Sequence, residues 1–193
     1  MKKLGILLIV VAFAFGFSSL LWAQPQSQKK EAGDKMEAAK KPIADRAFIT
    51  DTISGGIFEV EMGKVALEKS SNEEVKQFAQ RMVDDHSKAG DELRELASSK
   101  GMNPSQEMKK AHHHMFDKLS KLSGAAFDKA YMNHMVKDHV EDVSAFRKEA
   151  KEGKDSEVKA WASKILPTLE DHLKMARDLS KKVTGMKEPA KKN

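Results

Sequence analysis

Three histidines, each directly preceded by an aspartate, are the residues of this chain best suited to chemistry. They are His86, His139 and His172, and the first two end the near-identical stretches Met-Val-Asp-Asp-His and Met-Val-Lys-Asp-His. Neutral imidazoles are common ligands of zinc, copper and iron, and a nearby carboxylate can complete such a site. Buried histidines are also often simply hydrogen-bonded within a core, so their arrangement in space decides between the two.

The segments around these histidines have the periodicity of long amphipathic helices. Apolar residues recur at alternating steps of four and three, while Ala, Leu, Met, Lys and Glu dominate the composition. We predict four long helices, at about 45–69, 71–100, 124–152 and 155–183, and a short one at about 103–122. The pattern therefore indicates an all-α four-helix bundle in which the short helix is a crossover between two helical pairs.

Local signals mark where several of these helices begin. Ser71 to Glu74 form a capping box, Asn103-Pro104 is typical of a helix start, and Asp155 is a cap for the last helix. Pro167 lies inside the last helix, where its missing N–H predicts a kink about one turn before the third histidine.

Each histidine falls within the apolar stripe, near the middle of its predicted helix. In a roughly antiparallel bundle, mid-helix residues meet in one layer whichever way the helices run. The middle of the first helix adds Glu59 and Glu61 to that layer. We therefore predict a metal site formed by His86, His139, His172 and Glu59. The alternative is a polar core layer whose side chains only satisfy one another.

Aspartates and methionines beside the histidines are candidates for supporting roles. Asp85, Asp138 and Asp171 are turned about 100° from the histidine that follows each of them, so they either accept a ring N–H from a neighbouring helix or form salt bridges. Met82 and Met135 each lie four residues before a histidine. A thioether beside an imidazole favours copper, whereas a carboxylate favours zinc or iron. Alternatively, these methionines only fill the core.

Signatures of particular reactions are missing from the sequence. Di-iron carboxylate bundles need Glu-x-x-His pairs, but Val83, Val136 and Leu169 stand three residues before the histidines. We also find no phosphate-binding loop, dinucleotide fingerprint or nucleophile arrangement. We therefore expect a binding protein more than an enzyme, and a redox or hydrolytic enzyme is the less favoured alternative.

The remaining histidines are expected at the surface. His112, His113 and His114 are consecutive and must point to different faces of a helix, which predicts a surface cluster able to capture metal opportunistically. His134 stands four residues before Asp138, the spacing of an exposed helix pair.

The N-terminus predicts export. Lys2-Lys3 precedes an apolar run from Leu4 to Leu21 and then Ala23, so residues 1–23 have the pattern of a signal peptide, with an uncleaved anchor as the alternative. Residues 24–43 have the composition of a flexible tether, 44–183 hold the bundle, and 184–193 have that of a disordered basic tail.

Composition narrows the expected partners. The absence of cysteine excludes disulfides, thiolate metal sites and a lipoprotein anchor. The net charge is only +5, and lysines are interleaved with acidic residues, so we expect no nucleic acid and membrane contact only through the leader or the basic ends. A metal ion or a small ligand is the expected partner. The sequence does not indicate an oligomeric state.

Three stretches of the chain resemble an exported bacterial family. They are FEVEMGKVALEKSSNEEVKQFAQRMVDDHSKA, LSGAAFDKAYMNHMVKDH and VKAWASKILPTLEDHLKMA. The resemblance, to proteins catalogued as domain of unknown function 4142, spans about Phe48 to Leu179. It implies a ferritin-like bundle and a periplasmic or outer-membrane-associated location, but no established activity. Our own expectation is an exported bundle that binds a metal ion or a small ligand in its core, with a part in envelope stress tolerance. The positions that match the family's motif are Met82, Asp85, His86, Met135, Asp138, His139 and His172.

Overall fold

A computed structural model describes residues 45–185, and within that range the chain forms five helices and no strand. The helices are α2 (Arg46–Lys69), α3 (Glu73–Ser99), α4 (Lys110–Leu119), α5 (Gly124–Glu152) and α6 (Ser156–Thr184). The all-α prediction is confirmed. The predicted signal peptide, the tether and residues 186–193 of the tail lie outside the described range.

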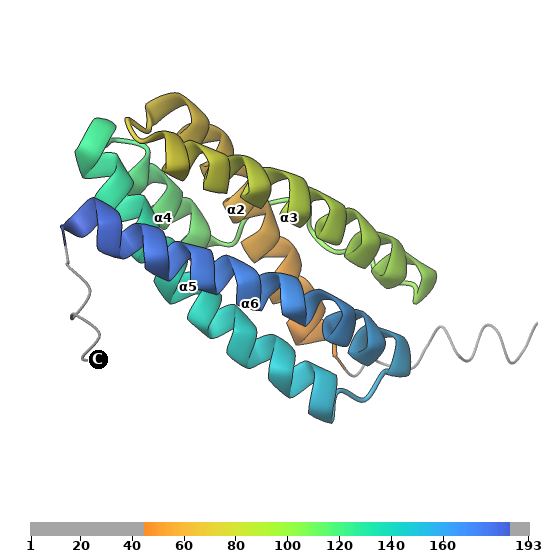
Figure 1. The fold of residues 1–193 in the computed structure, drawn as a ribbon. Coiled ribbons are helices and arrows are strands. Elements are labelled where there is room, and N and C mark those ends of the chain that lie inside the picture. The colour runs from red at the N-terminus through yellow and green to blue at the C-terminus, as the bar shows by residue number, and fades with distance from the viewer. Residues whose placement is uncertain (1–44, 186–193) are drawn as a thin grey trace, which may run out of the picture. The chain divides into compact units, whose positions relative to one another are not determined.

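Two helical hairpins make up the bundle. In Figure 1, α2 and α3 run antiparallel as one pair, and α5 and α6 run antiparallel as the other. The pairs meet where α3 contacts α6 and α2 contacts α5, while α4 packs against α2 and α5. Two helix pairs joined by one long crossover are the arrangement of a ferritin-like bundle. Between residues 45 and 185, no helix combines the length and the apolar character needed to cross a bilayer.

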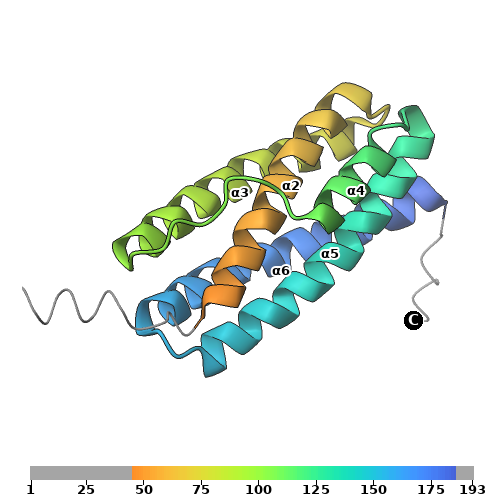
Figure 2. The same ribbon diagram turned by 180° about the vertical axis from the view of Figure 1, so that it is seen from behind.

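The crossover helix is shorter than the sequence pattern predicted. It begins at Lys110, not at Pro104, and residues 102–109 are not helical and include a bend at residues 106–107. Their placement has a physical reason, because Met102 and Pro104 are buried and the backbone N–H of Lys109 donates to Oγ of Ser54 at 2.7 Å. An extended chain advances about 3.3 Å per residue against 1.5 Å in a helix. The non-helical segment can therefore return from the end of α3 across α2 before α4 begins (Figure 2).

The N-terminus of α3 is capped one residue later than expected. Oδ1 of Asn72 accepts the backbone N–H groups of Glu74 at 2.9 Å and Val75 at 3.3 Å. The hydroxyl of Ser71 instead donates to Oδ2 of Asp128 on α5 at 2.7 Å, and its backbone N–H donates to the same oxygen at 3.3 Å. Ser71 thus joins the two hairpins, and the neighbouring Asn72 provides the cap.

Helix α6 starts where predicted and continues through its proline. Oδ1 of Asp155 accepts the backbone N–H groups of Glu157 and Val158, which confirms the expected cap. The helix runs on past Pro167 to Thr184 and ends at Gly185, whose φ of 72° is the left-handed conformation common at helix C-termini. The third histidine is therefore carried by one unbroken helical segment.

The apolar core is divided into two clusters. One surrounds Phe58, Phe78 and Tyr131, and the other surrounds Phe146 and Trp161. Near their boundary, each long helix contributes one buried polar side chain. These side chains are Glu59 on α2, His86 on α3, His139 on α5 and His172 on α6. The bundle thus contains a polar layer between two apolar halves.

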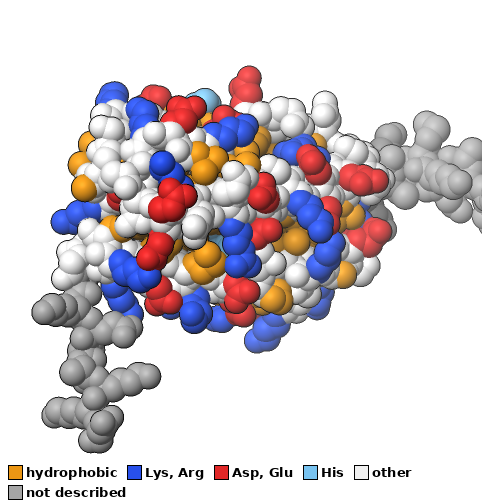
Figure 3. Space-filling view, turned by 45° about the horizontal axis from the view of Figure 1, so that its top comes forward, with side chains coloured by type: hydrophobic (Ala, Val, Ile, Leu, Met, Phe, Trp, Pro, Cys, Tyr) orange, Lys and Arg blue, Asp and Glu red, His pale blue; other side chains and the backbone are white. Residues whose placement is uncertain are grey.

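Charged side chains of both signs cover the bundle surface drawn in Figure 3, with lysines and arginines lying next to acidic residues. Salt bridges between consecutive helical turns are typical of this surface, for example that between Arg81 and Asp85 of α3 at 3.2 Å. Exposed pairs of this kind contribute only about 0–1 kcal/mol each. The stability of the domain therefore rests on its two apolar clusters, and the polar layer requires a separate explanation.

Candidate metal centre

Three imidazoles from three helices form a nearly equilateral triangle in the polar layer. The ring centroids of His86, His139 and His172 are 5.7, 5.3 and 5.5 Å apart, and their side chains are 9%, 0% and 1% exposed. One ring nitrogen from each lies within 4.8 Å of the other two. The structure thus brings the three predicted histidines together.

Two of these histidines use one ring nitrogen to fix their orientation. Nδ1–H of His139 donates to the carbonyl oxygen of Met135, one turn earlier on α5, at 3.0 Å. Nε2–H of His172 donates to Oδ2 of Asp85 on α3 at 2.8 Å. Because both acceptors are oxygens, the second nitrogen of each neutral ring carries a lone pair.

The third histidine is oriented by the carboxylate of α2. Nδ1 of His86 lies 2.8 Å from Oε2 of Glu59. The other carboxylate oxygen, Oε1, is 3.5 Å from Nε2 of His139 and makes no hydrogen bond with it. Glu59, only 3% exposed, therefore links the rings of two neighbouring helices.

Four buried atoms of the layer lack a hydrogen-bond partner. They are Nε2 of His86, Nε2 of His139, Nδ1 of His172 and Oε1 of Glu59. A buried acceptor left unpaired costs about 1–3 kcal/mol, and native proteins seldom leave such atoms together. Each unpaired nitrogen is the one not engaged by an orienting contact, as in protein metal sites where the second ring nitrogen is held by a carboxylate or carbonyl. The layer has the donor set of a metal site.

The spacing of the rings is compatible with one ion. With metal–nitrogen bonds of about 2.0–2.1 Å and tetrahedral angles, three bound imidazoles have centroids about 5 Å apart and ligand nitrogens about 3.4 Å apart. The observed centroid separations of 5.3–5.7 Å are close to that value. The ligand nitrogens lie within 4.8 Å of one another, so binding would require them to approach by up to about 1.4 Å.

Burial keeps all three imidazoles neutral, which is the form that binds metal. It lowers the pKa of His86 to about 4 against the opposing charges of Asp138 and Asp85. It likewise lowers the pKa of His139 to about 3 and that of His172 to about 4, with repulsion between the rings adding to both. At neutral pH the triangle therefore presents lone pairs and no positive charge.

Carboxyl groups beside the triangle are perturbed in the opposite direction. Burial raises the pKa of Glu59 to about 8. Burial and the negative charge of Glu59 together raise the pKa of Asp138 to about 8 and hold that of Asp142 well above its usual range. These groups resist ionisation where no cation faces them, so a bound cation would favour their charged forms.

Asp142 is a functional candidate that sequence reasoning missed. One oxygen of Asp142 lies within 4.8 Å of donor atoms from Glu59 and His139, forming a second group of potential ligands that overlaps the first. Its position three residues after His139 places both on one face of α5, a spacing that could have identified it. Asp142 was not selected from the sequence because only the aspartate directly before each histidine was considered.

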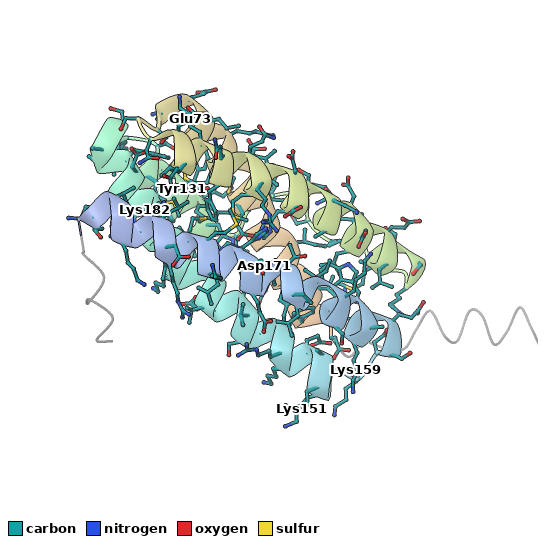
Figure 4. The ribbon with its side chains drawn as sticks, viewed as in Figure 1. Glu73, Tyr131, Lys151, Lys159, Asp171 and Lys182 are labelled. Atoms are coloured by element: carbon teal, nitrogen blue, oxygen red, sulfur yellow. The ribbon has the colours of Figure 1, made fainter. Side chains whose placement is uncertain are left out.

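The three predicted supporting aspartates have different environments. Asp85 makes the contact to a neighbouring helix's histidine that was expected of it. Although partial burial opposes it, hydrogen bonds from His172 and Arg81 lower the pKa of Asp85. Asp138 is half-buried and electrostatically coupled to Glu59 and His86. Asp171, labelled on α6 in Figure 4, is 69% exposed and lies 3.8 Å from Arg81, so its described partner is an arginine and not a histidine.

The two predicted supporting methionines belong to the apolar core. Met82 and Met135 are completely buried in the cluster around Phe58. Met135 supports the layer through its backbone carbonyl, which holds His139. These positions match the expected alternative in which the methionines fill the core.

Two histidines expected at the surface are partly buried. Nδ1 of His112 on α4 is 2.8 Å from Oγ of Ser54, and its ring stacks on Phe58 with centroids 5.6 Å apart. His134 on α5 contacts the same phenylalanine edge-on at 5.2 Å. Phe58 provides the apolar surface that draws both rings inward, whereas His113 and His114 are exposed as predicted.

Fold and site together define a class: a helical bundle of ferritin-like arrangement with a buried histidine–carboxylate layer contributed by its four long helices. Residues 27–179 match the family described as Domain of unknown function (DUF4142), which confirms the resemblance seen in the sequence. The chain belongs to that family. Comparison with curated proteins returned no match, and comparison with solved structures also returned none.

Proposed function

We propose that this domain binds one transition-metal ion in its polar layer, through His86, His139 and His172, with Oε1 of Glu59 as the fourth donor. The observation that carries the proposal is the set of four unpaired buried atoms, one from each proposed ligand. A purely structural layer would be expected to satisfy its own polar groups. The three nitrogens lie within 4.8 Å of one another, and Oε1 of Glu59 is 3.5 Å from Nε2 of His139. One cation would use all four once the Glu59 side chain turned towards the other two histidines.

The donor set favours zinc or another borderline divalent ion. Three neutral imidazole nitrogens and one carboxylate oxygen are ligands that zinc commonly takes in tetrahedral geometry. Copper(I) would be favoured by thioether donors, but Met82 and Met135 lie in the apolar cluster. We therefore propose zinc first, with copper and iron as the competing ions.

An envelope location accompanies this proposal. The leader-like pattern of residues 1–23 supports export, and the absence of cysteine makes a histidine–carboxylate site the available way to bind a transition metal tightly. Binding or buffering of metal in the envelope, in support of stress tolerance, is the role that these features favour. We assign no reaction to the site.

Metal content tests the proposal directly. The protein should be produced without a tag and with His113→Ala and His114→Ala, which remove exposed imidazoles but keep His112 on Phe58. Native mass spectrometry and elemental analysis after exposure to zinc, copper and iron should show one tightly held ion per chain. His86→Ala, His139→Ala and His172→Ala should each abolish stoichiometric binding.

Retention of metal by these variants, or a folded parent protein without any stoichiometric ion, would overturn the proposal. Circular dichroism of each metal-free variant separates loss of ligands from loss of fold.

A further inference from the structure

A cavity of about 170 Å³ borders the proposed metal centre. Its lining includes His86, His172 and Glu59, which are three of the four proposed ligands. Ions such as zinc accept a fifth ligand when the site leaves room for one. An ion held by these residues would have a space large enough for another molecule on one side. The unpaired ligand atoms are covered in this structure, so contact with the ion would require the His86 or His172 ring to shift.

The room arises where α2 carries glycine in place of a larger residue. A Cβ added at Gly56 would meet no atom within 4 Å, and one at Gly55 would meet only the His112 ring at 3.9 Å. Both glycines line the cavity, as does Ala89 on the facing helix α3. Glycine within a helix costs up to about 1 kcal/mol relative to alanine, and close helix packing does not account for Gly56.

The walls of the cavity are largely apolar. Leu93, Phe146, Trp161, Ile165 and Leu169 contribute to them. Apolar cavities of about 150 Å³ hold one benzene-sized molecule. The size and the walls therefore fit a compact apolar ligand of about one ring.

The cavity lining has more acidic than basic side chains, and the basic ones already have an acidic partner. Glu59, Asp85 and Asp142 lie in its lining. The two lysines of the lining both interact with one carboxylate. Lys164 forms a 2.8 Å salt bridge with Glu92, and Lys88 interacts electrostatically with the same residue. The lining therefore offers a carboxylate or a phosphate no uncompensated cationic side chain, and its apolar walls suit a neutral ring.

Building on the proposed function, we propose that this cavity admits a neutral, one-ring organic molecule that coordinates the bound metal through a single nitrogen atom. The apolar walls hold the ring, and the ion supplies the one strong polar contact. The event is a simple coordination: the ligand's lone pair forms a bond to the metal, with no transfer of electrons or protons between them. The site is thereby a receptor for a neutral nitrogen heterocycle as well as for a metal.

The test uses the full domain loaded with cobalt(II), whose visible absorption reports its ligands, and pyridine as the probe. Pyridine is neutral at pH 7.5, is about the size of benzene and has one donor nitrogen. We expect a saturable change in the cobalt spectrum with pyridine and at least a tenfold weaker response to benzoate, which carries a similar ring and a negative charge.

Two variants locate the response. Gly56→Leu and Ala89→Leu fill the cavity from opposite helices and should keep cobalt while weakening the pyridine response at least tenfold. Ile57→Leu, which changes the outer groove between α2 and α3, should leave the response unchanged. Having two filling variants keeps the test valid if one of them does not fold.

The outcomes separate the two proposals. A cobalt-loaded protein whose spectrum ignores pyridine, or responds equally after the cavity is filled, overturns the ligand inference and leaves metal binding intact. Failure of the parent protein to bind cobalt, zinc or copper would overturn both.

Discussion

Asp85 on α3 and His172 on α6 are joined by a hydrogen bond of 2.8 Å, which connects the two helical hairpins in the middle of the bundle. The bond gives Nε2 of His172 its acceptor and leaves Nδ1 as the ring's lone-pair nitrogen. Asp85 is in turn held by Arg81, one turn earlier on α3, at 3.2 Å. The orientation of one proposed metal ligand thus depends on a chain of polar contacts that begins at the surface.

Replacing Asp85 should weaken metal binding without removing a ligand. Asp85→Ala frees the His172 ring to turn and to change tautomer, so we expect zinc affinity to fall about 10–100-fold, the usual effect of losing a residue that orients a ligand. Competition titration with a chromogenic chelator measures the change.

Asp171→Ala is the matched control for this substitution. Asp171 also pairs with Arg81, at 3.8 Å, but is largely exposed, so its removal should leave zinc affinity nearly unchanged. Equal losses in the two variants would show that Arg81, and not the histidine contact, is responsible.

The pH dependence of the metal-free domain follows from two opposing sets of groups. The buried histidines, with pKa values of about 3–4, bind fewer protons in the folded state than in the unfolded state. The free energy of unfolding should therefore decrease as pH falls from about 6.5 towards 4. Glu59, with its pKa raised from 4.5 to about 8, binds more protons in the folded state. It should therefore lower the free energy of unfolding progressively as pH rises from about 4.5 to 8. Above pH 6.5 only the carboxyl groups act, and stability should decline.

Glu59→Gln should reduce that decline. The amide cannot ionise, and one proton per molecule is worth up to about 1.4 kcal/mol per pH unit. Between pH 6.5 and 8 we therefore expect the variant to gain about 1–2 kcal/mol relative to the parent, in urea denaturation with a chelator present. Glu61→Gln, on the same helix but paired with Lys64 at the surface, should show no such gain; a parent curve that rises over this interval would contradict the assignment.

Two glycines of α2 should respond oppositely to the same substitution. A Cβ at Gly63 would lie 2.8 Å from Cγ2 of Val83 and 3.1 Å from the backbone oxygen of Ala79, so Gly63→Ala must separate α2 from α3 and should cost about 1–3 kcal/mol. Gly56→Ala meets no neighbour within 4 Å and should gain up to about 1 kcal/mol from helix propensity. Chemical denaturation of both variants gives the comparison, and stabilisation by Gly63→Ala would exclude close packing at that position.

The attachment of α4 should depend on one buried serine. Oγ of Ser54 accepts the backbone N–H of Lys109 and lies 2.8 Å from Nδ1 of His112, so Ser54→Ala leaves two polar groups without this partner. We expect a loss of about 1–3 kcal/mol and faster amide exchange over residues 102–119. Ser144→Ala, on the exposed side of α5, serves as the control; unchanged exchange in Ser54→Ala would show that α4 is held by its apolar contacts alone.

Much of the helical pattern was readable from sequence because helix formation depends on neighbouring residues. The apolar repeat located the long helices, and Asp155 capped α6 as expected. The short helix was misplaced because the buried positions of Met102 and Pro104, and the bond from Lys109 to Ser54, join segments distant in sequence. Likewise, the inward placement of His134 depends on Phe58 of another helix.

The sequence by itself placed three histidines and Glu59 near the middle of the four long helices, with the histidines on the apolar face. From that placement we predicted that the four residues would share one layer. Only the tertiary structure decided which nitrogen of each ring is held, and that Asp85 and not Asp171 contacts a histidine of another helix. It also decided that Asp142 lies close to Glu59 and His139. The reason is physical: periodicity along a helix sets the face and height of a side chain, whereas hydrogen bonds between helices depend on their rotation and separation, which the packing of the whole core determines.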